Sequence, residues 1–346
     1  MAVTRSDVAR AAGVSPAVVS YVINSGTRPV SAAARARVGA AIARLNYRPN
    51  AIARALRGGA TQSVGLLTPS PLNPFYTELS GAIEHELFLR GYLLFAGVTN
   101  YDTAREQRYL RSFIDRKVDG LIFSSGMSLS SASIVGLDGT PLIVLDGSGD
   151  QQGISSVQAD DMSDAAYVVQ HLQNDGHALI GCVAGPPTIS SSLDRVRGWR
   201  EQLKSRGLGH GEDLVAHADI SEAGGNVAAH ALLGEHGRPW AMHGQRPSAL
   251  FVSSDVQAIG AIYACYELRL RIPDDVAIVS FGGIRAASFA SPPLTTMRQP
   301  VDIIACTAVD HLVACIEDRS TAPIHLELKG NLVVGRSCGC APGLRT

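Results

Sequence analysis

Nine arginines and one acidic residue, Asp7, lie within residues 1–60, which gives this stretch a formal charge of +8. The remaining residues carry 21 Lys and Arg against 30 Asp and Glu, so the whole-chain charge of −1 conceals two regions of opposite sign. Guanidinium groups neutralise phosphates and release counterions, which is the main sequence-independent source of affinity for duplex DNA. The pattern predicts a basic DNA-binding head and an acidic body.

The cysteines and histidines show no spacing typical of catalysis or of a metal site. Cys338-Gly339-Cys340 is the closest pair of thiols, but one intervening residue strains a local disulfide and no histidine lies beside it to complete a zinc set. We therefore expect free thiols and no metal. HExxH, a GxSxG elbow and a phosphate loop do not occur, so we expect no catalytic residues, no cofactor and no enzyme activity.

The basic stretch has the pattern of three short helices. Thr4 followed by Asp7 indicates a helix start, and Gly13 suits the turn after it. Ser15 can cap a second helix, with Pro16 at the first helical position, where proline is tolerated. Ser31 can cap a third helix, whose apolar positions are Ala34, Val38, Ala41, Ile42 and Leu45. The sequence predicts a helix-turn-helix and one small core.

Beyond Ser63 the pattern changes to apolar strands that alternate with amphipathic helices. The predicted strands are 64–67, 92–95, 118–123, 141–145, 178–181, 249–252 and 276–279. Such alternation is typical of parallel sheets with crossover helices. About 285 residues exceed one ordinary α/β unit, so we predict an α/β body of two Rossmann-like lobes with a ligand cleft at the carboxyl ends of their strands.

Three segments carry a family pattern: DVARAAGVSPAVVSYVIN, RPVSAAARARVGAAIARLNYRPNAIARALR and SPPLTTMRQP. They resemble the LacI family of bacterial transcription regulators, over nearly the whole chain. The resemblance implies a sequence-specific regulator, in particular a repressor. It also implies a helix-turn-helix head over 1–48, a hinge helix and linker over 49–61, and a periplasmic-binding-protein-like body over 62–346 that binds an effector and dimerises.

The resemblance places the second helix of the head in the major groove of double-stranded DNA. It implies base contacts by Pro16, Ala17 and Tyr21, and phosphate contacts by Ser15, Ser20 and Asn24. Thr4, Arg5 and Arg28 complete the contacts expected of the head. Pro16 and Ala17 offer no side-chain hydrogen bond, so the sequence does not reveal which operator is bound.

The segment from Pro49 to Arg57 resembles the hinge helix of the family, which orders on the operator and bends it. Leu56 matches the apolar side chain that wedges into the minor groove. Small Ala53 allows close approach of the dimer mate, and Arg54 and Arg57 lie near phosphates. The alternative is a basic linker without a role in bending.

The resemblance further implies that the chain crosses between the two lobes three times. We place the crossings near Asp160, Pro292 and Ala322. The first lobe then comprises 62–160 and 292–321, and the second comprises 161–291 and 322–346. A homodimer would present two heads to a pseudo-palindromic operator, and closure of the lobes on a ligand would change the spacing of those heads.

Eight residues are expected at the effector, and two of them depart from the family pattern. Arg195 matches an arginine that clamps the effector. Other matches are Asn73, Phe75, Tyr76, Asp146 and Asp160. Gly282 and Ser254 stand where the family often has Asp and Asn, and both changes remove strong acceptors, which weakens a sugar assignment. A sugar or sugar derivative, an anionic or partly apolar ligand, and no ligand at all remain open.

Alternative roles for these residues and for the whole chain remain open. Arg195 can instead pair with a neighbour such as Asp194, and Trp199 can stack on a ligand or fill the core. The N-terminus lacks an apolar signal region and no apolar run could span a membrane, so we expect a cytoplasmic protein on the nucleoid with no membrane partner. The rival functions are a periplasmic solute-binding protein, a ligand-independent regulator and an enzyme with an incidental basic leader.

Overall fold

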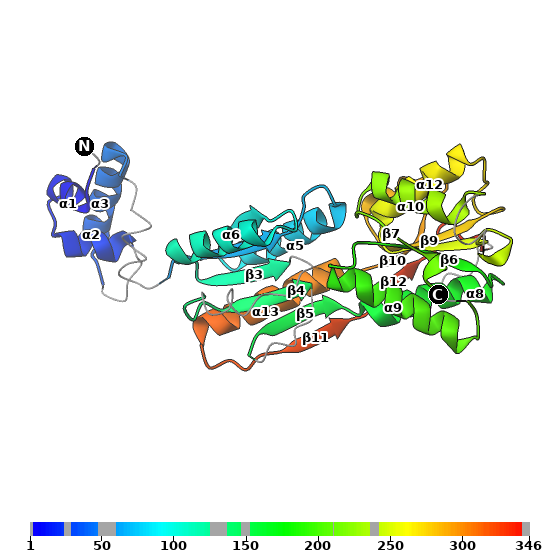
Figure 1. The fold of residues 1–346 in the computed structure, drawn as a ribbon. Coiled ribbons are helices and arrows are strands. Elements are labelled where there is room, and N and C mark those ends of the chain that lie inside the picture. Colours follow the sequence, from blue (N-terminus) through cyan, green and yellow to red (C-terminus); the bar gives the residue numbers. More distant parts are fainter. Residues whose placement is uncertain are drawn as a thin grey trace. The chain divides into compact units, whose positions relative to one another are not determined.

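The computed structural model describes residues 3–23, 29–47, 60–124, 137–146, 153–209, 211–235 and 242–340 (Figure 1). The chain divides into two compact units, residues 1–61 and 62–346. Six of the predicted DNA contacts lie outside the described residues: Asn24, Arg28, Ala53, Arg54, Leu56 and Arg57.

The amino-terminal unit contains the three predicted helices, α1 (Arg5–Ala12), α2 (Pro16–Ile23) and α3 (Ala32–Leu45). Gly13 adopts a left-handed conformation (φ 63°) between α1 and α2, which a residue with a side chain rarely adopts. Val8, Val19 and Val38 supply one fully buried residue from each helix. Arg37 Nε donates to the Ala12 carbonyl at 3.1 Å and so ties α3 to the end of α1.

The first lobe of the body is a six-stranded parallel sheet in the order β11-β5-β4-β3-β1-β2. Its strands are β1 (Ser63–Thr68), β2 (Leu93–Val98), β3 (Gly120–Ser124), β4 (Leu142–Asp146), β5 (Ser155–Ala159) and β11 (His325–Leu328). Helices α5 (Pro74–Leu89) and α13 (Val301–Glu317) pack together on one face, and α6 (Thr103–Asp115) packs on β1 and β2.

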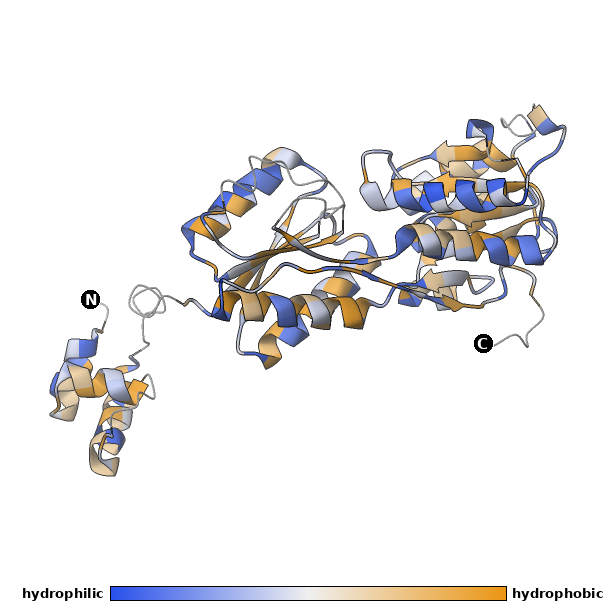
Figure 2. Cartoon of the chain, turned by 90° about the horizontal axis from the view of Figure 1, so that it is seen from below, coloured by the Kyte–Doolittle hydropathy of each residue, from blue (hydrophilic) through white to orange (hydrophobic). Residues whose placement is uncertain are grey.

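Apolar residues alternate across this first sheet. Leu66 and Ile122 belong to the core shared with α5 and α13, whereas Leu67 and Phe123 belong to the core that contains Phe113 of α6. This two-residue period places helices on both faces. The central strands β1, β3 and β4 are largely apolar, whereas β5 and β11 carry polar residues and the helices show both apolar and polar residues (Figure 2).

The second lobe is a six-stranded sheet in the order β12-β10-β9-β8-β6-β7, parallel except for β12. Its strands are β6 (Ile180–Ala184), β7 (Val215–His217), β8 (Ala249–Val252), β9 (Ala277–Gly282), β10 (Thr295–Arg298) and β12 (Asn331–Val333). The helices are α8 (Asp161–Asn174), α9 (Ser190–Ser205), α10 (Glu222–Leu233) and α12 (Asp255–Glu267), with short 3₁₀ helices η1 (Glu212–Leu214) and η2 (Arg285–Phe289).

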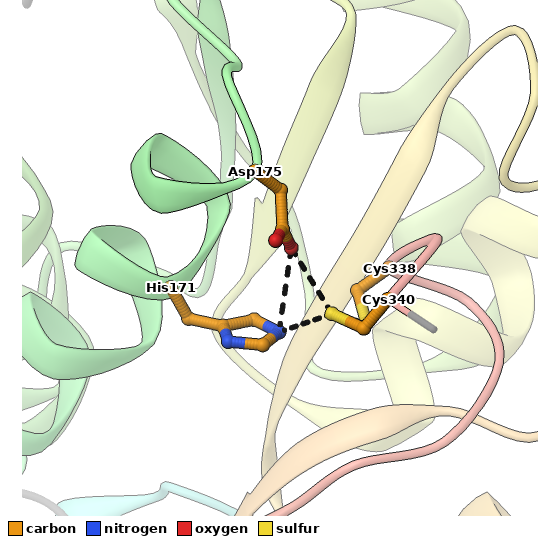
Figure 3. Close-up of side chains that lie close together, drawn as sticks. All are labelled: His171, Asp175, Cys338 and Cys340. Atoms are coloured by element: carbon orange, nitrogen blue, oxygen red, sulfur yellow. Dashed lines mark hydrogen bonds and ion pairs between the residues drawn. The ribbon is translucent and has the colours of Figure 1, made fainter. Parts of the chain in front are cut away.

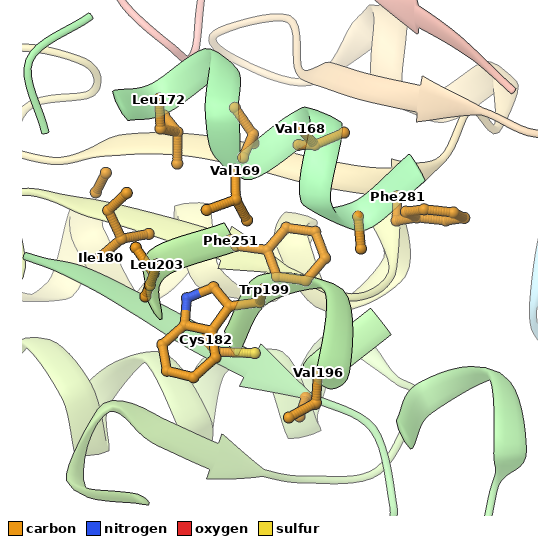
Figure 4. Close-up of a cluster of buried hydrophobic side chains, with 14 of the residues drawn as sticks. Val168, Val169, Leu172, Ile180, Cys182, Val196, Trp199, Leu203, Phe251 and Phe281 are labelled. Carbon is orange, nitrogen blue, oxygen red and sulfur yellow. The ribbon is translucent and has the colours of Figure 1, made fainter. Parts of the chain in front are cut away.

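Helices α8 and α9 contact each other over one core of the second lobe, and α10 and α12 contact each other over the other. Trp199 of α9 is fully buried with Leu172, Phe251 and Phe281 (Figure 4). Trp199 is therefore a core residue, and the alternative that it stacks on a ligand is wrong.

Two of the three predicted crossings between the lobes are misplaced. The first lies at Asp160, between β5 and α8, as predicted. The second lies at 299–300, because β10 pairs with β9, and the third at 329–330, because β11 pairs with β5. Residues 292–298 thus belong to the second lobe and 322–328 to the first. Polar Thr295 and Thr296 and the largely exposed β11 lack the apolar run by which a strand is recognised.

The mixed α/β fold with two mostly parallel sheets behind a helix-turn-helix is confirmed. Within the described parts of the chain, no helix is both long enough and apolar enough to cross a membrane.

Candidate functional site

The start of α1 is fixed by a reciprocal cap. The Thr4 hydroxyl accepts from the Asp7 backbone N–H at 3.3 Å, and the Thr4 backbone N–H donates to the Asp7 carboxylate at 2.9 Å. The Thr4 hydroxyl also donates to that carboxylate at 2.6 Å. These hydrogen bonds lower the pKa of Asp7. Thr4, predicted as a DNA contact, therefore has a structural role as a helix cap.

The amino-terminal turn of α2 is exposed and does not belong to the small core of the head. Ser15, Pro16 and Ala17 are exposed, while Ser20 and Tyr21 are half-buried beside fully buried Val19. Ser15 Oγ accepts from the Val18 N–H at 3.4 Å, and no acidic side chain occupies the first turn of α2. Half-buried Arg5 begins α1. The surface is suited to a groove of DNA, but contact by these residues stays a prediction.

In the second lobe, Arg195 of α9 is held by groups from other elements. Its Nε donates to Asp161 Oδ1 at 2.8 Å, one terminal nitrogen donates to the Ser253 carbonyl at 2.8 Å, and the guanidinium lies 4.1 Å from the centre of the Phe281 ring. The side chain is 12% exposed. Asp194 pairs with Arg197 instead. Arg195 is thus fixed by residues of other elements, at the carboxyl ends of β8 and β9.

Ser254 and Gly282 lie at the same edge of the second sheet. Ser254 directly precedes α12, is buried, and makes no cap with its side chain. Gly282 has φ +134°, and a Cβ atom there would lie 3.2 Å from Asp255 Oδ2. Asp255 accepts hydrogen bonds from Ser280 Oγ (2.5 Å), Thr296 Oγ1 (2.6 Å) and the Ile284 N–H (2.8 Å). Asp255 is therefore committed to holding the loop that follows β9.

In the first lobe, Asn73 caps α5 by accepting from the Phe75 N–H at 3.1 Å. The Phe75 and Tyr76 rings meet edge to face at 5.1 Å, and Phe75 packs against cores of both lobes. Asp146 ends β4 beside Ser124. Asp160 Oδ1 accepts from the Ser163 N–H at 3.2 Å and caps α8. All five predicted effector residues of this paragraph end a strand or lie at the start of a helix that follows one.

A cavity of about 250 Å³ lies at the first crossing, with residues of both lobes around it. Its polar lining includes Gln158, Asp160, Ser190, Ser191, Asp194 and Glu327. Of the eight predicted effector residues only Asp160 lines it, although Asp161, which also lines it, holds Arg195. Gly282 lines a different cavity, of about 660 Å³, with Glu78, His85 and Arg298. Arg195, Ser254 and Gly282 therefore lie at the same edge of the second sheet. Asp160 is linked to Arg195 through its neighbour Asp161, which pairs with the arginine.

Several residues at the strand ends escaped sequence reasoning. Asp161 and the backbone of Ser253 position Arg195, and the run Ser190-Ser191-Ser192 begins α9. This run of serines lies directly before the arginine motif that contains Arg195, and it is the sequence feature that could have indicated the site. In the first lobe, Thr68 Oγ1, Ser124 Oγ and Glu106 Oε2 are buried with no hydrogen-bond partner in the described parts of the chain. Burial raises the pKa of Glu106 to about 7.

The head and body each match a known family. Residues 4–50 match the family described as bacterial regulatory proteins, lacI family, and residues 169–338 match the periplasmic binding protein-like domain. The ribose operon repressor of Escherichia coli is 34% identical over 94% of this chain and 96% of its own. The chain belongs to the LacI family of bacterial regulatory proteins. It is a transcriptional repressor with a DNA-binding domain and an effector-binding domain, as the sequence analysis predicted.

Other relatives agree with this assignment. The transcriptional repressor PurR of Aliivibrio salmonicida is 30% identical over 96% of this chain and 98% of its own. The Lac repressor dimer bound to operator has the same fold, with a TM-score of 0.85, 27% identity and coverage of 98% and 99% of the two chains. A transcriptional regulator CelR–cellobiose complex gives a TM-score of 0.72 at 27% identity, covering 97% and 99%.

Proposed function

We propose that this LacI-family repressor binds a pseudo-palindromic operator as a homodimer and that a sugar or related polyol held between its lobes changes its affinity for DNA. The observation that supports the proposed ligand site is the position of the Arg195 guanidinium. Asp161 and the Ser253 carbonyl fix it beside the cavity at the first crossing. A planar guanidinium held in place can donate to paired hydroxyl oxygens without a loss of side-chain entropy on binding.

The chemistry of that cavity favours a neutral hydroxylated ligand over an anion. Its lining carries the carboxylates of Asp160, Asp161, Asp194 and Glu327, together with serine hydroxyls. Carboxylates accept hydrogen bonds from hydroxyl groups and repel anions. These acids supply acceptors in a different cavity from the one that Gly282 lines. The relatives named for ribose and the complex with cellobiose support the same class of ligand.

A homodimer is supported by apolar side chains that the body leaves exposed. They are Phe88 and Leu89 of α5, Leu93 and Phe95 of β2, Tyr263 and Tyr266 of α12, Phe289 of η2 and Ile303 of α13. Large exposed apolar groups on both lobes indicate an interface with another chain. The Lac repressor was solved as a dimer.

Because this repressor acts on DNA, we place it on the bacterial nucleoid, in the cytoplasm. We propose no catalytic activity, in line with its repressor relatives.

The predicted head contacts are tested by mobility shift across salt concentrations with an operator selected from genomic fragments. Tyr21→Ala should reduce the preference for the operator over random DNA by roughly tenfold, since it removes a base contact. Arg57→Ala should weaken binding to both DNAs and flatten the salt dependence, since it removes a phosphate contact. Equal losses on both DNAs for Tyr21→Ala would remove Tyr21 from base recognition.

The ligand class is tested by thermal shift of the full chain with pentoses, hexoses, disaccharides, sugar phosphates and nucleosides. A ligand that binds the native state raises its melting temperature. We expect neutral sugars to raise it and sugar phosphates to leave it unchanged. A shift confined to anions would overturn the polyol assignment, and no shift in any class would favour a ligand-independent repressor.

A further inference from the structure

Four side chains with metal-binding atoms converge at the far end of α8 (Figure 3). His171 and Asp175 lie four residues apart on or directly after this helix, and Cys338 and Cys340 come from the segment that follows β12. One donor atom from each residue lies within 4.8 Å of all the others. Sequence spacing gave no histidine beside Cys338, but the fold brings His171 to it.

The distances within the cluster are short. Cys340 Sγ lies 2.9 Å from His171 Nε2, 3.0 Å from Asp175 Oδ2 and 2.8 Å from Cys338 Sγ. His171 Nε2 and Asp175 Oδ2 are 3.7 Å apart. Zinc bonds of about 2.0 to 2.3 Å in a tetrahedron set ligand atoms roughly 3.3 to 3.8 Å apart. Movements of about 1 Å or less in the side chains would therefore seat the ion.

The donor set is specific in its chemistry. Two thiol sulfurs, one imidazole nitrogen and one carboxylate oxygen match the ligands that zinc prefers, and four protein ligands leave no open position for a substrate. Such a closed set is typical of a structural rather than a catalytic ion.

The segment that carries the two cysteines is held in place independently of any ion. The Ser337 hydroxyl donates to the Ile278 carbonyl at 2.6 Å and accepts from the Thr295 N–H at 2.9 Å. Thr295 Oγ1 donates to Cys338 Sγ at 3.0 Å, and Cys338 is 2% exposed. A hydroxyl that donates to a ligand sulfur orients it and favours its thiolate form. Gly339, at φ +83°, provides the tight turn between the two cysteines.

We propose that His171, Asp175, Cys338 and Cys340 bind one Zn²⁺ ion that fastens the carboxyl-terminal segment to α8 in the second lobe. This zinc site replaces the expectation from the sequence that the chain binds no metal. Asp160 and Asp161 lie at the opposite end of α8, where Asp161 holds Arg195, so the ion stabilises the helix that positions the proposed effector contact without touching the effector.

The test is the metal content of the full-length chain, purified without a histidine tag under reducing conditions and measured by elemental analysis. We expect about one zinc per chain, and at least tenfold less in the double variant Cys338→Ser with Cys340→Ser. Cys306→Ser is the matched control, since Cys306 lies on α13 in the first lobe, and should retain its zinc. Zinc retained in full by the double variant would overturn the site.

Replacement of zinc by Co²⁺ in the unmodified chain gives a test that does not depend on folding of a variant. Thiolate ligation predicts a sulfur-to-cobalt charge-transfer band and visible bands of tetrahedral intensity in the unmodified chain. A weak octahedral spectrum without the charge-transfer band would overturn the proposal. So would a chain that takes up no zinc and in which peptide mapping of protein purified without reductant finds a Cys338–Cys340 disulfide.

Discussion

Two buried carboxyl groups, Asp255 of the second lobe and Glu106 of the first, differ in the hydrogen bonds that they accept. Asp255 of the second lobe is 1% exposed and accepts hydrogen bonds from Ser280, Thr296 and the Ile284 N–H. Glu106 of the first lobe is 3% exposed, and its Oε2 has no partner in the described residues. Burial raises the pKa of both groups, that of Glu106 to about 7.

The difference lies in how completely the buried polar groups at the two sheet edges are hydrogen-bonded. At the edge of the second sheet, Asp255 and Arg195 are fixed by groups from several elements, so that edge is ordered before any ligand arrives. At the edge of the first sheet, Thr68, Ser124 and Glu106 keep buried atoms without partners in the described ranges. Buried polar atoms without partners are costly, so Thr68, Ser124 and Glu106 retain a capacity for hydrogen bonds that the Asp255 carboxylate has already used. In the described part of the second lobe, Ser192 Oγ and Trp199 Nε1 on α9 are likewise buried without a partner.

The largest expected effect is that of Asp255→Ala on stability. The change leaves the Ser280 and Thr296 hydroxyls and the Ile284 N–H buried without their acceptor, so we expect a loss of about 4 kcal/mol in the free energy of unfolding. Urea unfolding monitored by circular dichroism measures it. A loss below about 1 kcal/mol would mean that this network adds little, and the contrast with Glu106 would fail.

Glu106→Gln should change the pH dependence of stability. The pKa of Glu106 is about 7 in the folded chain against an ordinary value of 4.5, so between these pH values the native state holds a proton that the unfolded chain has lost. Stability is then fully present below pH 4.5 and falls as pH rises through about 7, by up to about 3 kcal/mol. Glutamine carries no charge, so the variant should lose this slope and become the more stable protein at pH 8.

Glu84→Gln is the matched control for that measurement. Glu84 is exposed on α5, in the same lobe, and its replacement should leave the slope between pH 5 and 8 unchanged. Urea midpoints at four pH values suffice. Parallel curves for the unmodified chain and Glu106→Gln would show that Glu106 finds a partner in the folded protein.

Arg195→Ala tests whether the ordered edge of the second lobe serves the effector. Removing the guanidinium should weaken binding of the proposed sugar ligand by at least about tenfold, near 1.4 kcal/mol, because the fixed donors are lost. Binding to the operator without ligand should be unchanged. Arg197→Ala, on the same helix but exposed and paired with Asp194, is the control. An unchanged ligand response in Arg195→Ala would refute its role.

Sequence reasoning succeeded where a pattern is local and periodic. The caps at Thr4 and Ser31 and the apolar runs of β3 and β8 identify their elements without any partner. It failed for β10 and β11, because Thr295, Thr296 and the exposed residues of β11 become strands by pairing with β9 and β5. That pairing depends on residues distant in the sequence.

The candidate sites divide in the same way. Arg195 was found from its motif, but its partners Asp161 and Ser253 lie 34 and 58 positions away. Folding also unites His171 with Cys340 across 169 positions. A sequence read without its fold identifies a reactive side chain more readily than the neighbours that decide what it does.

The smallest effect that bears on the comparison is that of Gly282→Ala. The φ of +134° is strained for any residue with a side chain, and the added Cβ would lie 3.2 Å from Asp255 Oδ2, so we expect a loss of about 1 to 2 kcal/mol. Gly81→Ala, at an exposed position of α5 with open space around its Cβ, should instead stabilise the chain by about 0.5 kcal/mol. Equal changes in the two variants would mean that the loop after β9 is not held by Asp255, and the second lobe would then be no better ordered than the first.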